Sequence, residues 1–259
     1  MMGKDHFLIS LAWAFLLLVP VLLQYPMYAL AFIIGIALGS VYPDIDSSHN
    51  PFWDNSHNGL EEGNGVLTWL MGLVAYPAKH LTGFVFSRGD KKTKKDYLDH
   101  RNLMHSILGI LFSLSVILIP VNLILHFIGC WNPAILIGSI GVLAGAFMHL
   151  MEDSCTLAGV KFLYPIFKKE LLKGKIRVST NSAAAGKLFS VLFAFPAIVY
   201  LAYDLVLKDS QYFSQYGIID KLSFLDGLSP ELKIGMMAVV SIFIWLLCFG
   251  ISQAKSWSR

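Results

Sequence analysis

Long runs of apolar residues separated by short polar segments dominate this chain. A helix needs about 20 apolar residues to cross the hydrocarbon core of a bilayer, with a range of about 17–25. The pattern therefore predicts an all-α, polytopic helical membrane protein with about six transmembrane helices and an additional interfacial helical segment. The six predicted spans are 7–23, 25–42, 103–128, 133–149, 188–207 and 234–251.

Local features refine these spans. Only Gln24-Tyr25-Pro26 separates the first two spans, which predicts a tight helical hairpin. Pro120 lies inside the long third span and predicts a kink or a tilt there. The fourth span contains three glycines, Gly138, Gly141 and Gly145. Because glycine has no side chain, these positions predict that another helix approaches this span closely.

A seventh apolar stretch, 66–86, is less clear. It contains Pro77, Lys79 and His80 together with two glycines, and such residues are costly at the centre of a bilayer. This stretch either spans the membrane or lies at its surface.

Composition agrees with a membrane location. The chain is 56% hydrophobic and only 14% charged, whereas soluble domains carry about 25% charged residues. The net charge of +3 is too small to indicate a nucleic-acid partner. Three separated cysteines, Cys130, Cys155 and Cys248, form neither a disulfide framework nor a zinc motif.

The basic residues set the orientation of the spans. They gather in the loops 43–102 and 151–187 and near both chain ends, whereas the connections at 24–26 and 129–132 contain neither Lys nor Arg. The positive-inside rule then places both basic loops and both termini in the cytoplasm of a multi-pass inner-membrane protein. This arrangement requires that 66–86 does not cross.

The amino-terminal apolar run also resembles a secretory signal, because Lys4 precedes it. Apolar sequence nevertheless continues to Val41, where a mature soluble protein would turn polar, and this favours a retained first span. We expect a metal-site membrane domain over 1–187 and a two-helix hairpin over 188–259.

Seven residues with metal-binding side chains lie where the first four spans meet the cytoplasmic face. Chance would rarely place all of them at one depth, although a single His at an interface is more often a polar anchor. Imidazole and carboxylate ligands suit zinc, manganese or iron, and seven candidates allow one to three ions. The predicted ligands are His6, Asp44, Asp46, His100, His105, His149 and Asp153.

Spacing supports this set. His149 and Asp153 are four residues apart, so they share one helix face. His100 and His105 would diverge on a continuous helix, and a turn near Asn102 would bring them together. His126, at the outer end of the third span, we interpret as structural, and His49, His57 and His80 as candidate outer-shell residues.

Clustered metal ions would activate a water molecule and bind the oxygens of a phosphoryl group. Asp44 or Asp46 would orient the water or act as general base, and Arg101 would pair with phosphate. Glu152 is a further candidate base, although its position beside Asp153 turns it to another helix face.

Two other classes of function compete with an enzyme. A transporter or channel would place ionisable residues at mid-span and show repeated halves, but the midpoints here are apolar, as at Leu16 and Val116, and we find no internal repeat. A metal-stabilised membrane scaffold without turnover would carry the same ligands as an enzyme.

The motifs resemble those of the YdjM/YbcI-type membrane-bound metal-dependent hydrolase family. The resemblance covers roughly 1–170 and rests on Pro43-Asp44-Ile45-Asp46, on His100-Arg101 with His105-Ser106, and on a stretch from His149 to Pro165. Asn102-Leu103-Met104 departs from the Gly-Thr or Gly-x-Thr that the family often has.

This resemblance implies a helical membrane protein with a metal site that matches the seven ligands above. It also implies a distant similarity to zinc-dependent phospholipase C, and hence phosphoester hydrolysis, with membrane lipids as partners and lipid headgroups among the expected substrates.

Overall fold

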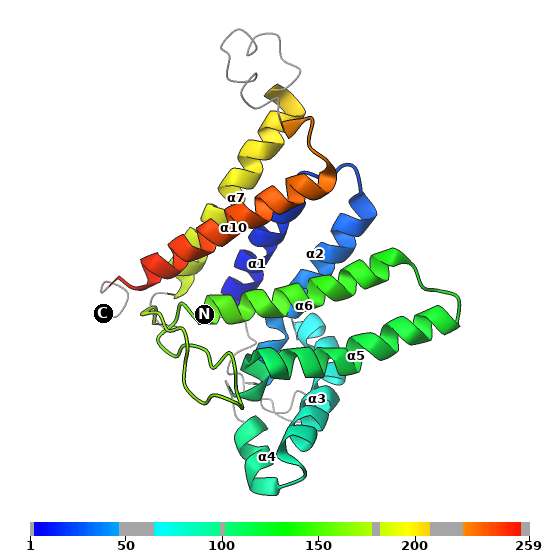
Figure 1. Ribbon diagram of the computed structural model, residues 1–259, viewed down its shortest axis with the longest axis vertical. Helices are drawn as coiled ribbons and strands as arrows, with labels where there is room; N and C mark the ends of the chain where they lie inside the picture. The colour runs from blue at the N-terminus through cyan, green and yellow to red at the C-terminus, as the bar shows by residue number, and fades with distance from the viewer. Residues whose placement is uncertain (1–2, 47–64, 99–101, 178–181, 208–224, 255–259) are drawn as a thin grey trace.

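The computed structural model describes residues 3–46, 65–98, 102–177, 182–207 and 225–254 (Figure 1). Within these ranges the chain is helical and contains no strand, with two isolated β-bridges between Thr156 and Ile176 and between Val160 and Leu172. The all-α prediction is confirmed. The long helices are α1 (Gly3–Leu18), α2 (Pro26–Val41), α3 (Gly65–Ser87), α5 (Ile107–Phe127), α6 (Pro133–Asp153), α7 (Ser182–Ala202) and α10 (Pro230–Ser252).

Four helices in the described part are long and apolar enough to cross a membrane: α5, α6, α10, and α7 with its continuation to Leu205. Helix α2 is apolar but shorter. Both α1 and α2 have 16 residues, about 24 Å of helix against a hydrocarbon core of about 30 Å. Each of the six predicted spans contains a long helix, although α1 ends at Leu18, five residues before the predicted end of the first span. The count of six that cross stays a prediction.

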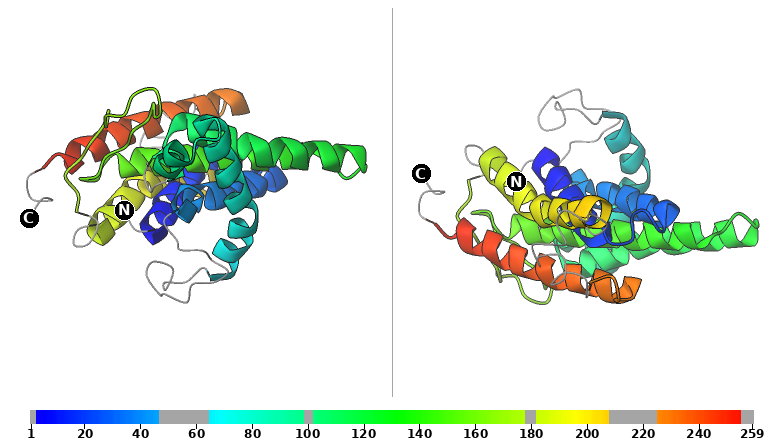
Figure 2. Two further views of the ribbon diagram at one scale, coloured as in Figure 1. Left: turned by 90° about the horizontal axis from the view of Figure 1, so that it is seen from below. Right: turned by 90° about the horizontal axis from the view of Figure 1, so that it is seen from above.

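The helices alternate in direction. Figures 1 and 2 show the start of α1 and the ends of α6 and α10 on one side of the molecule, while the α5–α6 turn lies on the opposite side. Helices α1, α5 and α7 therefore lead away from this side, and α2, α6 and α10 return to it. Five of the predicted ligands, His6, Asp44, His105, His149 and Asp153, lie at or next to helix ends on that shared side.

Helices α2 and α6 pack backbone against backbone. A Cβ atom added to Gly39 would lie 2.0 Å from the carbonyl oxygen of Val142, and one added to Gly145 would lie 2.3 Å from that of Ile36. Only glycine permits this approach. The prediction from the glycines of the fourth span is confirmed, and the helix that approaches is α2.

Two apolar cores hold the bundle. The first joins α1 to the carboxyl-terminal helices, with Ile9, Phe189 and Met237 among its buried residues. The second joins α2, α5 and α6 around Ile110 and Leu150. The carboxyl-terminal helices α7 and α10 thus pack on α1, the helix that carries His6. The expected domain boundary stays a prediction.

Helix α5 starts later than the sequence pattern predicts. It begins at Ile107, where the Ser106 hydroxyl accepts a hydrogen bond from Gly109 N and caps the helix. The preceding residues Leu103–His105 form the 3-10 helix η2. We expected the helix to be interrupted by a turn near Asn102. The structure places His105 in η2, before the first residue of α5.

The stretch 66–86 lies within helix α3, which continues through Pro77 and leads to the short helix α4 (Lys91–Leu98). Helix α3 is not among the four span candidates of the described part. Its predicted place at the membrane surface stays a prediction.

Candidate metal centre

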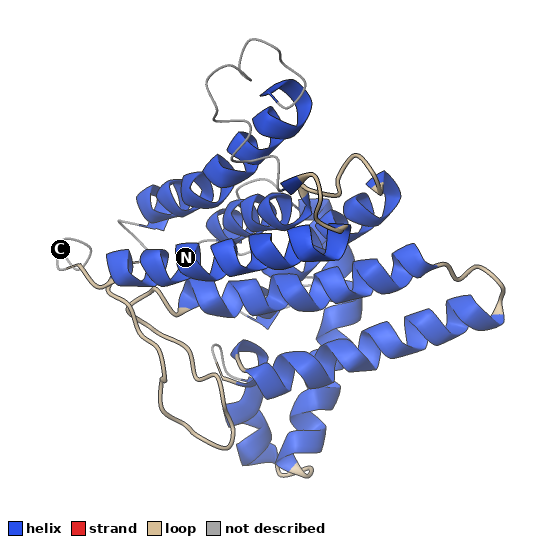
Figure 3. Cartoon of the chain, turned by 45° about the horizontal axis from the view of Figure 1, so that its top comes forward, coloured by secondary structure: helices blue, strands red, loops and turns tan. Residues whose placement is uncertain are grey.

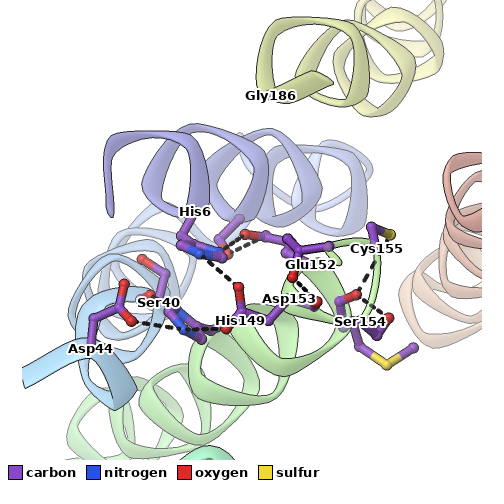
Figure 4. A network of polar contacts seen from close by, with 12 residues as sticks. His6, Ser40, Asp44, His149, Glu152, Asp153, Ser154, Cys155 and Gly186 are labelled. Atoms are coloured by element: carbon purple, nitrogen blue, oxygen red, sulfur yellow. Dashed lines mark hydrogen bonds and ion pairs between the residues drawn. The ribbon is translucent and has the colours of Figure 1, made fainter. Parts of the chain in front are cut away.

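Four chain segments bring side chains to a single point at the shared helix ends. His6 comes from α1, Asp44 from the 3-10 helix η1 (Pro43–Asp46), His105 from η2, and His149 and Asp153 from the last turns of α6. Figure 4 shows His6, Asp44, His149 and Asp153 pointing toward one another. Segments more than a hundred residues apart in sequence thus form one cluster.

The ring nitrogens of the three histidines face the two carboxylates. The Nε2 atoms of His105 and His149 each lie 3.4 Å from Asp44 Oδ1 and 3.7 Å from Asp153 Oδ2. His6 Nε2 lies 3.4 Å from Asp153 Oδ1. The two oxygens of Asp153 therefore face different histidines.

These distances fit a metal ion better than direct hydrogen bonds. Hydrogen bonds between nitrogen and oxygen are about 2.7–3.2 Å long. Ligand atoms about 2.0–2.1 Å from a tetrahedral zinc ion are separated from one another by about 3.3–3.4 Å. The side chains of His6 and His149 are buried, yet their Nε2 atoms have no hydrogen-bond partner in the described part of the chain.

Two triplets among the described residues can hold a metal ion: His6, His149 and Asp153, and Asp44, His105 and His149. Within each triplet the ligand atoms lie within 4.8 Å of one another. His149 belongs to both triplets, so the two form one continuous centre.

A backbone carbonyl orients His149. Its Nδ1 lies 2.7 Å from the carbonyl oxygen of Ser40, at the end of α2. A carbonyl oxygen only accepts, so Nδ1 must carry the proton and donate it. In the neutral ring the lone pair is then on Nε2, and Nε2 is the atom that faces both carboxylates.

Glu152 orients His6 in the same way. Its Oε2 lies 2.6 Å from His6 Nδ1, and its Oε1 accepts a hydrogen bond of 3.0 Å from the Ser10 hydroxyl. Such carboxylate–histidine pairs fix the ring of a metal ligand and raise its basicity. His6 and His149 also stack on each other, with ring centroids 3.9 Å apart.

Asp44 forms the open side of the centre. Its side chain is 29% exposed, whereas the side chains of His105 and Asp153 are each 1% exposed. Burial by itself raises the pKa of Asp44, but the neighbouring His149 and His105 hold the pKa well below its ordinary value. The carboxylate is therefore ionised at neutral pH, the form that ligates cations.

The structure brings five of the seven predicted ligands together: His6, Asp44, His105, His149 and Asp153. The backbone of Asp46 continues η1, but its side chain lies outside the described part, as do His100 and Arg101 entirely.

The remaining candidates lie elsewhere. Glu152 contacts His6 on the side away from the carboxylates, and its catalytic role stays a prediction. His126 is exposed near the far end of α5, and His80 packs against Tyr76 with ring centroids 4.3 Å apart. His49 and His57 are outside the described residues.

Sequence reasoning missed two supporting residues. Ser10 lies four residues after His6, so both occupy one face of an apolar helix, and this spacing was a usable signal. The Ser40 carbonyl has no such signal in the sequence, because every residue has a backbone carbonyl. Only the packing of α2 on α6 directs this one toward His149.

A family model described as YdjM inner membrane protein matches residues 1–256. The match therefore includes α7 and α10, beyond the roughly 170 residues that carry the motifs. Neither the curated proteins nor the solved structures contain a match to this chain.

Proposed function

Because this chain belongs to the YdjM inner membrane protein family, we propose that it is a membrane-bound metal-dependent hydrolase. Its substrates would be phosphoesters at the cytoplasmic face of the membrane, lipid headgroups among them. The observation that carries this proposal is the set of three imidazoles and two carboxylates gathered at the ends of apolar helices, with nitrogen–oxygen separations of 3.4–3.7 Å.

The triplet of Asp44, His105 and His149 suits a first ion. Asp153 Oδ2, which lies 3.7 Å from the Nε2 atoms of both histidines, is a candidate fourth donor. The second oxygen of Asp153, which faces His6 Nε2 at 3.4 Å, suits a second ion. Mixed nitrogen and oxygen ligands favour zinc, with manganese and iron as the alternatives.

A divalent ion bound by these residues would act as a Lewis acid that activates water and polarises a phosphoryl oxygen. The chain's own residues perform the other tasks. Asp44, the partly exposed carboxylate of the cluster, would orient the entering water or accept its proton. Arg101 would pair with the phosphate oxygens through its planar fork.

Glu152 fits a positioning role better than the role of general base. Both of its oxygens are engaged, one with His6 and one with Ser10, and it is 2% exposed. It holds the His6 ring in place from behind.

The positions of the charged residues in α5 and α6 disfavour a function as a transporter or channel. In α5 no residue is Asp, Glu, Lys or Arg, and those of α6 are confined to Glu152 and Asp153 at its end. A polar path through the middle of the bilayer would need such groups deeper in these helices.

The test uses the full chain purified in detergent or nanodiscs. Metal content is measured by mass spectrometry, and hydrolysis of bis(p-nitrophenyl) phosphate and of phospholipids is followed before chelation, after chelation, and after addition of zinc, manganese or iron. We expect bound metal, activity lost on chelation and restored by one metal, and no activity in His149→Ala. His126→Ala, far from the centre, is the matched control and keeps both properties. Bound metal without turnover on any of these substrates would favour the scaffold, and activity that survives chelation would contradict the proposal.

A further inference from the structure

The segment 157–173, which we call the connecting loop, follows the end of α6 as irregular chain (Figure 3). Backbone hydrogen bonds fix this segment to the bundle. Ile107 N, at the start of α5, donates to Phe162 O at 3.0 Å, and Leu157 N donates to Ile176 O at 3.1 Å. Directly after the loop, Lys175 N donates to Ser252 O at the end of α10 at 2.9 Å. The connecting loop therefore lies at the level where three span candidates end.

Its apolar residues face two ways. Val160, Phe162 and Tyr164 are buried against the bundle. Ile166 and Phe167, in contrast, are 68% and 58% exposed. Three further apolar side chains of the same loop are exposed, namely Leu157, Leu163 and Leu171. Exposed apolar side chains that gather in one loop indicate a surface that contacts a membrane or another molecule and not water alone.

Strong positive charge accompanies this apolar surface. The loop and the residues up to Arg177 contain Lys161, Lys168, Lys169, Lys173, Lys175 and Arg177, and one acidic residue, Glu170. The side chains of Lys168, Lys169 and Lys173 are exposed.

The neighbouring helix α4 extends this basic surface. Tyr164 donates a hydrogen bond of 2.8 Å to Asp96 Oδ2, and Lys168 lies 3.9 Å from the same oxygen. These contacts hold α4, with its four lysines at 91, 92, 94 and 95, against the connecting loop.

We propose that the connecting loop is a docking surface for anionic phospholipid headgroups of the surrounding bilayer. Ile166 and Phe167 insert below the headgroups, and Lys168, Lys169 and Lys173 bind the lipid phosphates. Two observations select this occupant: the loop lies at the level of the helix ends, and its exposed apolar tip carries lysines directly beside it, the combination that binds anionic interfaces. The inference does not depend on metal binding or on turnover.

The test places an environment-sensitive fluorophore at the tip. Phe167→Cys, and Ile166→Cys as a second position, are made in full-length protein carrying Cys130→Ser, labelled with NBD and reconstituted into phosphatidylcholine vesicles with increasing phosphatidylglycerol. Quenching by lipids with a shallow nitroxide is compared with quenching by aqueous iodide. Circular dichroism verifies that each variant keeps its helices.

Because interfacial insertion is about 5–10 Å deep, we expect a blue-shifted emission and at least about twofold stronger quenching by nitroxide lipid than by iodide. This ratio should rise with phosphatidylglycerol. Lys168→Glu with Lys169→Glu should abolish the rise, since each lysine near an anionic surface changes binding by about fivefold. Lys233→Glu, at the opposite end of α10, should leave it intact.

Two results would overturn the proposal. Full quenching by iodide and none by nitroxide lipid at every lipid composition would place the loop in water. Shielding of the fluorophore from both quenchers, with disulfide cross-linking between copies of the unlabelled Phe167→Cys variant through the introduced thiol, would identify a second copy of the chain as the occupant.

Discussion

His149 donates its Nδ1 proton to the backbone carbonyl of Ser40 across 2.7 Å, and this bond links the end of α2 to the centre of the cluster. The acceptor is a main-chain atom, so no substitution of the Ser40 side chain removes it. The bond depends instead on how closely α2 approaches α6. The distance between α2 and α6 therefore determines the orientation of the His149 ring.

Gly39→Ala tests this link. A Cβ atom there would lie 2.0 Å from Val142 O and 2.9 Å from Ala146 N, both backbone atoms that cannot turn aside. We expect the helices to separate, with a loss of about 1–3 kcal/mol of stability, the usual cost of overpacking, and reduced metal content. Thermal unfolding in detergent and metal analysis measure the two effects.

Gly250→Ala on α10 is the matched control, since nothing lies within 4 Å of its added Cβ. It should leave metal content unchanged and, as a helical Gly-to-Ala change, slightly raise stability. Equal behaviour of the two variants would mean that the α2–α6 contact does not set the site.

Glu152 provides a second prediction. Glu152→Ala removes the acceptor that lies 2.6 Å from His6 Nδ1, and loss of such an outer partner lowers metal affinity by about 10–100-fold. Glu152→Gln should fall between Glu152→Ala and the wild type, because its amide oxygen still accepts. Metal titration against a competing chelator gives the affinities.

Glu170→Gln, an exposed change in the connecting loop, is the control for Glu152→Gln and should retain full affinity. A general-base role predicts a different pattern for Glu152→Gln, in which metal affinity is unchanged and turnover is lost. That pattern would refute the positioning role.

The part of the polar cluster that lies on a single helix could be predicted from the sequence, because residue spacing along one helix sets which side chains share a face. His149 and Asp153 are one helical turn apart on α6, and both point to the centre. Glu152 was expected to face elsewhere, and it does, yet that other face packs on α1 and so reaches His6. Sequence spacing gives the direction of a side chain along one helix but not the neighbour that it meets.

Helix ends were less predictable than helix existence. The apolar pattern of the third span extends back to Leu103, but Ser106 caps the helix, so the helix begins only at Ile107. Leu103 and Met104 are apolar and buried, but they lie in η2 beside His105 and not in helix α5. Hydropathy does not separate a buried apolar residue from one in a spanning helix.

Cysteine labelling tests the predicted orientation. Cys130 is exposed on the α5–α6 turn, opposite the cluster, whereas Cys155 and Cys248 are buried. If the cluster faces the cytoplasm, a membrane-impermeant maleimide applied to spheroplasts labels Cys130 from outside. Labelling only after the cells are lysed would place the cluster on the outer face and contradict the topology.

Cys155 should resist modification at alkaline pH. Burial raises the pKa of its thiol to about 12 from an ordinary value of 9.0. Folding therefore keeps the thiol protonated, and its contribution to stability, present below pH 9, is lost as pH rises toward 12. In purified protein we expect iodoacetamide at about pH 9, the ordinary pKa of a thiol, to modify Cys130 rapidly and Cys155 only after denaturation. Rapid reaction of both in folded protein would contradict its burial.

The central claim is that three histidines and two aspartates at the shared helix ends hold a transition metal. Its most direct test is anomalous diffraction from the full-length protein at the zinc, manganese and iron absorption edges. The account predicts an anomalous peak at one of these edges among the side chains of His105, His149, Asp44 and Asp153, and its loss in His149→Ala. A wild-type structure in which these side chains and that of His6 are ordered and no anomalous peak lies among them, after growth with all three metals, would contradict it.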